Sequence, residues 1–146
     1  MRYFLLVAAA LLTTACQERK SSLDINSAKL RSNLALSAFE CSHVAPNPAE
    51  ASRLFNLGVL AGRDFLEFAT GNQSGFKSIA SQIDPVWTRN GNRPSADFHL
   101  GEIHAASVGR AYADRGRMDD RDWEVRRNEI YAQRNCPFLR SETKAK

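Results

Sequence analysis

The stretch over residues 48–70 constrains the fold most, because its ends and its apolar face together indicate one long helix. Asn47 is a favourable N-cap, Pro48 suits the first helical position, and Glu50 can complete a capping box. Apolar and small residues recur at helical spacing and define the predicted inward face: Leu54, Phe55, Gly58, Ala61, Gly62, Phe65, Leu66 and Ala69. The two glycines on this face lie four residues apart, so we expect a neighbouring helix to approach closely there.

Two shorter segments flank this helix in the predicted structure. The first is a helix capped by Asn26 or Ser27 that runs to about residue 43. Its predicted inward face consists of Leu30, Leu34, Ala38 and Cys41. On the other side, a short helix starts at Ser74 and extends through Ile83, before a loop over residues 87–94.

Two further helices are predicted in the second half of the chain. Ser95 caps a helix that runs to about residue 115, with Asp97 in its first turn. The residues expected mostly on its inward side are Phe98, Gly101, Ile103, Ala105, Val108, Gly109 and Tyr112. A last helix over residues 119–133 is expected to bury Trp123 and Ile130.

No strand pattern and no internal repeat is evident, so the sequence predicts an all-α protein, a compact bundle of four to five helices. The 146 residues suit a single domain. We expect a signal peptide over residues 1–15, a polar tether over 16–26, the helical domain over 27–139 and a charged tail over 140–146.

The N-terminus predicts export. Arg2 supplies a positive charge, residues 4–12 form an apolar run, and Thr13-Thr14-Ala15 provides a small-residue cleavage site. The apolar run is far shorter than the ~20 residues that span a bilayer. The expected location is therefore the periplasm.

The three cysteines extend this prediction. Cys16 directly after the cleavage site resembles a bacterial lipobox, in which the cysteine carries the lipid, although Thr13 stands where lipoboxes usually have Leu. Lipidation of Cys16 would leave Cys41 and Cys136 as an even pair, and an oxidising compartment favours a disulfide between them. The alternative is ordinary cleavage after Ala15, which gives a soluble periplasmic or secreted protein with a third thiol.

The candidate catalytic and metal-binding residues each have a structural interpretation that we favour. His99 and His104 are five residues apart and diverge around a helix, so with Glu102 they are expected to be surface side chains and not metal ligands. Cys41 and His43 point apart on a helix, which argues against a Cys–His nucleophile. The carboxylates Asp119, Asp120, Asp122 and Glu124 suit the start of a helix without any acid–base role. We therefore predict no catalytic residues, no metal and no cofactor.

Arginine is abundant between residues 89 and 140, with ten arginines and eight acids in that span. The net charge of the span is only 10 − 8 = +2, and the signs are interleaved, which favours salt-bridged helix faces over a nucleic-acid surface. Trp87, Arg89 and Arg93 lie in the most irregular segment and are the candidate partner contact. The equal alternative for Trp87 is that it covers the core.

Residues 55–66, FNLGVLAGRDFL, and 96–103, ADFHLGEI, resemble motifs of small exported, lipoprotein-like helical proteins of Gram-negative bacteria. The similarity extends over most of the domain, including Asn135-Cys136, and it implies a helix packing without an activity. More distantly, an exported helical domain with a glycine-bearing helix and a long-range cysteine pair is similar to the Tai/Rap-type immunity proteins of type VI secretion. Those proteins bind and block a toxin; no residue here is matched to a toxin contact.

Together these features predict an exported, non-catalytic envelope protein that binds a protein or another envelope component. The membrane is an expected partner through a lipid on Cys16. The alternatives are a structural envelope lipoprotein and an enzyme whose site assembles from distant residues.

Overall fold

The computed structural model describes residues 23–89, 95–113 and 115–140, and it confirms an all-α architecture. The helices are α1 (Ile25–His43), α2 (Pro48–Gly71), α3 (Gln73–Ile79), α4 (Ala96–Ala111) and α5 (Asp120–Gln133). Three 3-10 turns lie between and after them: η1 (Pro85–Trp87), η2 (Arg115–Arg117) and η3 (Cys136–Phe138). The described residues contain no strand.

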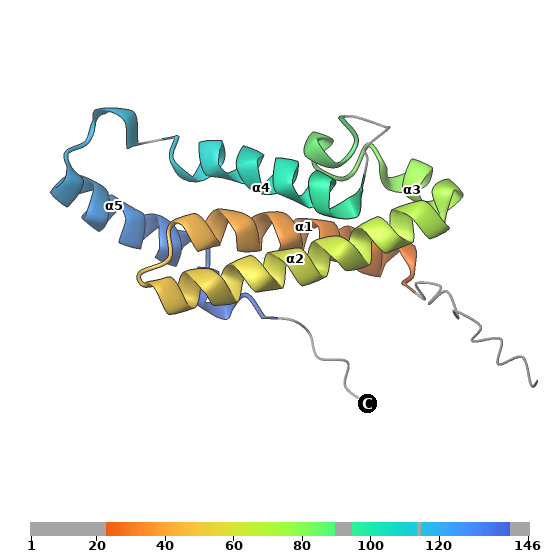
Figure 1. Cartoon of the computed structure of the whole chain (residues 1–146), viewed down its shortest axis with the longest axis horizontal. Coiled ribbons are helices and arrows are strands. Elements are labelled where there is room, and N and C mark those ends of the chain that lie inside the picture. The colour runs from red at the N-terminus through yellow and green to blue at the C-terminus, as the bar shows by residue number, and fades with distance from the viewer. Residues whose placement is uncertain (1–22, 90–94, 114, 141–146) are drawn as a thin grey trace, which may run out of the picture.

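The two longest helices, α1 and α2, run side by side in opposite directions, as expected for helices joined by a four-residue loop (Figure 1). The α4 helix lies along α1 and also packs on α2, α3 turns back at one end of the molecule, and α5 lies at the other end (Figure 1). The predicted signal peptide, Cys16 and the final six residues lie outside the described residues.

Asp24 begins the first helix, because its side chain accepts a hydrogen bond from the backbone N–H of Ser27 at 2.9 Å. Asn26 and Ser27, the predicted caps, are therefore already inside α1. Leu23 packs against the core ahead of the cap. The packed part of the chain thus includes residues before position 27, where the sequence placed the start of the domain.

The close approach predicted at the two glycines of α2 is confirmed. A Cβ atom added to Gly58 would lie 2.7 Å from the ring of Phe39 in α1, and one added to Gly62 would overlap the side chain of Leu100 in α4. Gly62 therefore lies where α4 packs on α2, and Gly58 where α1 does. Glycine is about 1 kcal/mol less favourable than alanine at each of these helical positions, and the close packing that it allows offsets this cost.

The inward face of α4 differs from the predicted one, and that of α1 differs at Leu30, whereas Ala38 and Cys41 are buried as predicted. Leu30 is 62% exposed, and the residues of α1 with no exposed surface are small: Ala28, Ser32, Ala35 and Ala38. On α4, Phe98 is 52% exposed, whereas His99, Leu100, Ile103, Ser107 and Ala111 are buried. Small residues allow helices to approach closely, so the packed faces combine alanine and serine with larger side chains such as Phe39 of α1 and Leu100 of α4.

The disulfide joins Cys41, near the end of α1, to Cys136, just after α5, as predicted. Around it lies a second core cluster of buried residues that is separate from the main core: Cys41, Val44, Ala45, Leu54, Ala111, Trp123, Ile130 and Cys136. Asn135 precedes the bonded cysteine with φ of 54°, a left-handed conformation that asparagine tolerates better than most residues. The disulfide therefore attaches α5 to the α1–α2 pair.

The predicted N-caps of α2 and α4 are confirmed, whereas α4 ends earlier than predicted. Asn47 and Ser95 cap α2 and α4 with side-chain oxygens, as the sequence indicates. The α4 helix stops at Ala111 instead of near residue 115. Among the described residues, no helix has the length and apolar character needed to cross a bilayer.

Candidate functional site

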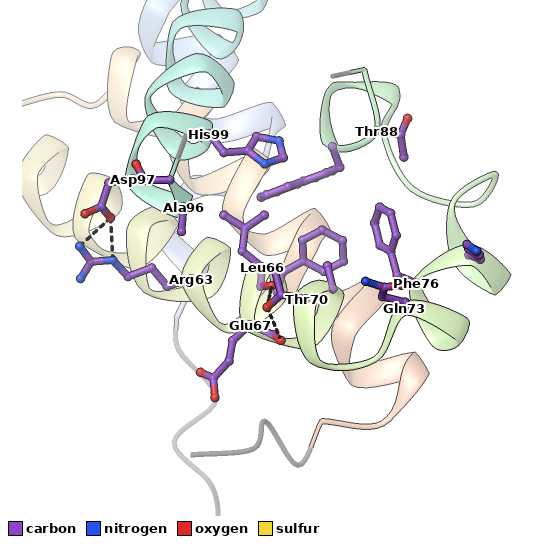
Figure 2. Close-up of a pocket in the computed structure, with 15 residues that line it drawn as sticks. Arg63, Leu66, Glu67, Thr70, Gln73, Phe76, Thr88, Ala96, Asp97 and His99 are labelled. Atoms are coloured by element: carbon purple, nitrogen blue, oxygen red, sulfur yellow. Dashed lines mark hydrogen bonds and ion pairs between the residues drawn. The ribbon is translucent and has the colours of Figure 1, made fainter. Parts of the chain in front are cut away.

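The candidate site is a cavity of about 690 Å³ between α2, α3, η1 and α4, which we call the aromatic cavity. Its wall contains buried or half-buried apolar and aromatic side chains: Phe65, Leu66, Ala69, Phe76, Trp87 and His99. Figure 2 shows side chains from all these elements converging on it. This size and lining are typical of pockets that enclose a small molecule or an apolar group of a partner.

Four aromatic rings form a continuous row in this wall. Phe65 contacts Phe76 and Trp87, with ring centroids 6.1 and 4.6 Å apart, and Trp87 lies 5.9 Å from His99. These tilted and edge-on arrangements are the favourable ones for aromatic rings. The row therefore ties together α3, α2, η1 and α4 around the cavity.

Trp87 is 3% exposed and belongs to the main core. Its Nε1–H has no hydrogen-bond partner among the described residues. A buried donor without an acceptor typically costs about 1–3 kcal/mol. The burial of Trp87 agrees with the expectation that it covers the core; its ring also lines the cavity, and its role as a partner contact stays a prediction.

The other two residues of the predicted contact have different outcomes. Arg89 is exposed next to η1, where its charge contributes to lowering the pKa of Asp84. The main cause of that lower pKa is Arg110, which donates two hydrogen bonds to the Asp84 carboxylate at 2.7 and 2.9 Å. Arg93 lies outside the described residues.

The rim of the cavity carries charges of both signs. Arg63 of α2 donates to Asp97 of α4 at 2.9 Å across one side of the opening (Figure 2). Glu67 and Lys77, also at the rim, are exposed and of opposite charge. These four charges, the ones that the described residues place at the rim, sum to zero.

His99 is the lining residue that the sequence misplaced, since it was expected on the surface and is 9% exposed. It lies on the same face of α4 as Ile103, Ser107 and Ala111, at steps of four residues. Taking Ile103, Ser107 and Ala111 as the packed face would have placed His99 in the interior. The described residues contain no group of three or more His, Cys, Asp or Glu placed to hold a metal ion.

A second histidine feature lies between α1 and α4. The rings of His43 and His104 are 4.6 Å apart, and His104 also packs on Phe39 and Phe55. Burial is the main cause that lowers the pKa of both imidazoles, and for His43 the nearby His104 lowers it further. Tyr112 closes this cluster by donating to the backbone carbonyl of His43 at 3.2 Å.

This pair predicts a loss of stability in mild acid. The folded pKa values lie below the ordinary value of 6.5, so the unfolded chain takes up protons first as the pH falls. Stability should be complete above pH 6.5 and decrease below it, and the double variant His43→Gln/His104→Gln should flatten this dependence. Urea unfolding midpoints at neutral pH and at mildly acidic pH measure the effect; a midpoint that does not fall would contradict the buried pair.

At the end of α2 away from the aromatic cavity, Glu50 links α2 to α5. Its carboxylate accepts two hydrogen bonds from Arg53 and one from the hydroxyl of Tyr131. The Arg53 bonds are the main reason why the pKa of Glu50 falls to about 2, while burial and the Glu50 carboxylate raise the pKa of Tyr131 to about 12. Glu50 thus serves this ion pair, and the predicted capping interaction is one-sided: Asn47 accepts from the Glu50 N–H at 2.9 Å.

We expect Glu50 to contribute to acid stability in a lower pH range than the histidines. Its folded pKa of about 2 lies below its ordinary value of 4.5, so its contribution is present above pH 4.5 and is lost as the pH falls toward 2. Because Arg53 is partly exposed, solvent screening limits the effect to about 1 kcal/mol. In urea titrations, Glu50→Gln should remove the part of the destabilisation that develops between pH 4.5 and 2. If the variant loses stability over this pH range as the unmodified protein does, the Glu50–Arg53 pair contributes nothing.

No family model matches the sequence, and comparison with curated proteins and with solved structures found no significant match. The resemblance to exported helical proteins and to Tai/Rap-type immunity proteins therefore stays a prediction.

Proposed function

We propose that this chain is an exported protein of the cell envelope that acts by binding, and that the aromatic cavity is its binding site. The single observation that carries the proposal is the cavity itself, which offers about 690 Å³ with a mostly apolar surface and polar and charged side chains around it. Apolar surface around such a space favours an apolar occupant, because filling it removes hydrocarbon from water.

The disulfide supports the export half of the proposal. Bonds such as Cys41–Cys136 form and persist in oxidising compartments, and the predicted signal peptide leads to one. A lipid on Cys16 would hold the domain at a membrane, seven residues before Leu23, which packs against the core.

Site-specific photocrosslinking in the native cells tests the binding half. Ala96 lies exposed at the cavity rim, and Ala105 lies exposed on the same helix outside the cavity lining. With the photoreactive residue p-benzoylphenylalanine at either position, we expect an adduct at 96 and not at 105. No adduct at 96, or the same adducts at both positions, would refute binding through the cavity. The mass of the adduct distinguishes a small molecule from a protein.

A further inference from the structure

We propose that the occupant of the aromatic cavity is a small, uncharged molecule with a flat aromatic ring system. This inference rests on the proposed function, since it names what the same cavity binds. It follows from three properties of the cavity: its size, the row of rings in its wall and the balance of charge at its rim.

The size sets the class of molecule. A cavity of about 690 Å³ lies within the ~300–1,000 Å³ that is usual for pockets enclosing drug-sized ligands. Its walls come from four different elements, and the contacts between them fix its shape. A molecule of a few fused or linked rings fits this space.

The row of rings favours an aromatic occupant over an alkyl chain. Phe65, Trp87 and His99 already contact one another edge-on or tilted, and each ring also lines the cavity. A flat ring placed among them can continue the same edge-to-face and offset contacts, which contribute beyond the area they bury. A saturated ring or chain of equal size gains only the burial of its surface.

The rim favours an uncharged occupant. Arg63 and Asp97 already neutralise each other, and Glu67 and Lys77 carry opposite charges. A ligand ion would leave water without meeting a net counter-charge, and that desolvation is unfavourable. The rim therefore selects against both anions and cations.

Competition binding to the full exported protein tests this inference. The fluorescent probe N-phenylnaphthylamine, itself uncharged and aromatic, is displaced by matched competitors: β-naphthol, its saturated counterpart β-decalol, dodecanol, β-naphthoate and β-naphthylmethylammonium. We expect β-naphthol to compete at about tenfold lower concentration than β-decalol, the equivalent of one or two aromatic contacts. The two ions and dodecanol should compete less well than β-naphthol.

Two variants that replace an alanine by phenylalanine test whether the probe binds in the cavity. Ala69 is half-buried in the cavity wall, so Ala69→Phe should fill the space and reduce probe affinity at least tenfold, while the exposed control Ala105→Phe should leave it unchanged. Equal competition by β-decalol or dodecanol would overturn the aromatic class, and stronger competition by either ion would overturn the uncharged class. If the probe does not bind but Ala96 crosslinks to a protein, this inference fails and the proposed function stands. If the probe does not bind and position 96 gives no adduct, both the proposed function and this inference are wrong.

Discussion

Without the Cys41–Cys136 bond, the domain is expected to lose about 4–5 kcal/mol of its free energy of unfolding. The two cysteines are 95 positions apart, and in the chain-entropy model a cross-link of that span lowers the conformational entropy of the unfolded chain by the equivalent of about 4–5 kcal/mol. Cys41→Ala/Cys136→Ala, compared with the oxidised protein in a shared Cys16→Ser background, isolates the effect in urea titrations. Unfolding curves that differ by less than about 1 kcal/mol would contradict it.

The loss should also be uneven across the molecule. Trp123 belongs to the cluster around the disulfide, whereas Trp87 belongs to the main core beside the aromatic cavity. Trp87→Phe and Trp123→Phe each leave a single tryptophan. In the reduced protein, the emission of Trp123 should shift to longer wavelength at a lower urea concentration than the emission of Trp87. Simultaneous shifts would mean that the two clusters unfold as one unit.

Gly58→Leu is expected to have the second largest effect, a destabilisation of about 2 kcal/mol. The new side chain would start 2.7 Å from the ring of the buried Phe39, and overpacking of this kind costs about 1–3 kcal/mol or more. The gain of helix propensity, about 1 kcal/mol, offsets only part of that cost. Thermal and urea unfolding measure the difference.

Gly101→Leu is the matched control, because nothing lies within 4 Å of a Cβ added to this exposed position in α4. It should stabilise the protein by up to about 1 kcal/mol through helix propensity alone. Phe39→Ala should partly relieve Gly58→Leu in the double variant, since the two side chains compete for the same space. If Gly58→Leu and Gly101→Leu behave alike, α1 and α2 do not approach as closely as described.

Local chemistry made parts of this fold predictable. The caps Asn47 and Ser95, the burial of Trp123 and Ile130, and the close contact at Gly58 and Gly62 could all be predicted from short-range sequence patterns. The disulfide followed from the number of cysteines and the predicted compartment, and the structure brings Cys41 and Cys136 together. Each of these inferences depends on one residue type with a strong preference.

The inward faces of α1 and α4 could not be predicted from large apolar residues. Leu30 and Phe98 are exposed, whereas the packed faces bury alanine and serine together with larger side chains such as Phe39 and Leu100. The buried Ser32 and Ser107 satisfy their hydroxyls by donating to backbone carbonyls of their own helices, at 2.8 and 2.6 Å. Hydrophobic periodicity gives such serines no weight, so it misplaced Leu30 on α1 and most of the inward face of α4.

The aromatic cavity escaped prediction for a related reason. Phe65, Phe76, Trp87 and His99 come from four elements, and no spacing in the sequence links them. Trp87 drew attention through its irregular surroundings, but its role depends on how η1 folds back onto Phe65. Long-range packing of this kind is not encoded in any local pattern.

Export is the central property proposed for this protein, because the compartment determines the redox state of the cysteines and the choice of partners. The intact mass of the protein from its native cells, with and without reduction and alkylation, tests this most directly. We predict a chain that begins at Cys16, carries a diacylglyceryl group there, and has Cys41 and Cys136 oxidised. A chain that still begins at Met1, with all three thiols free to alkylate, would contradict it.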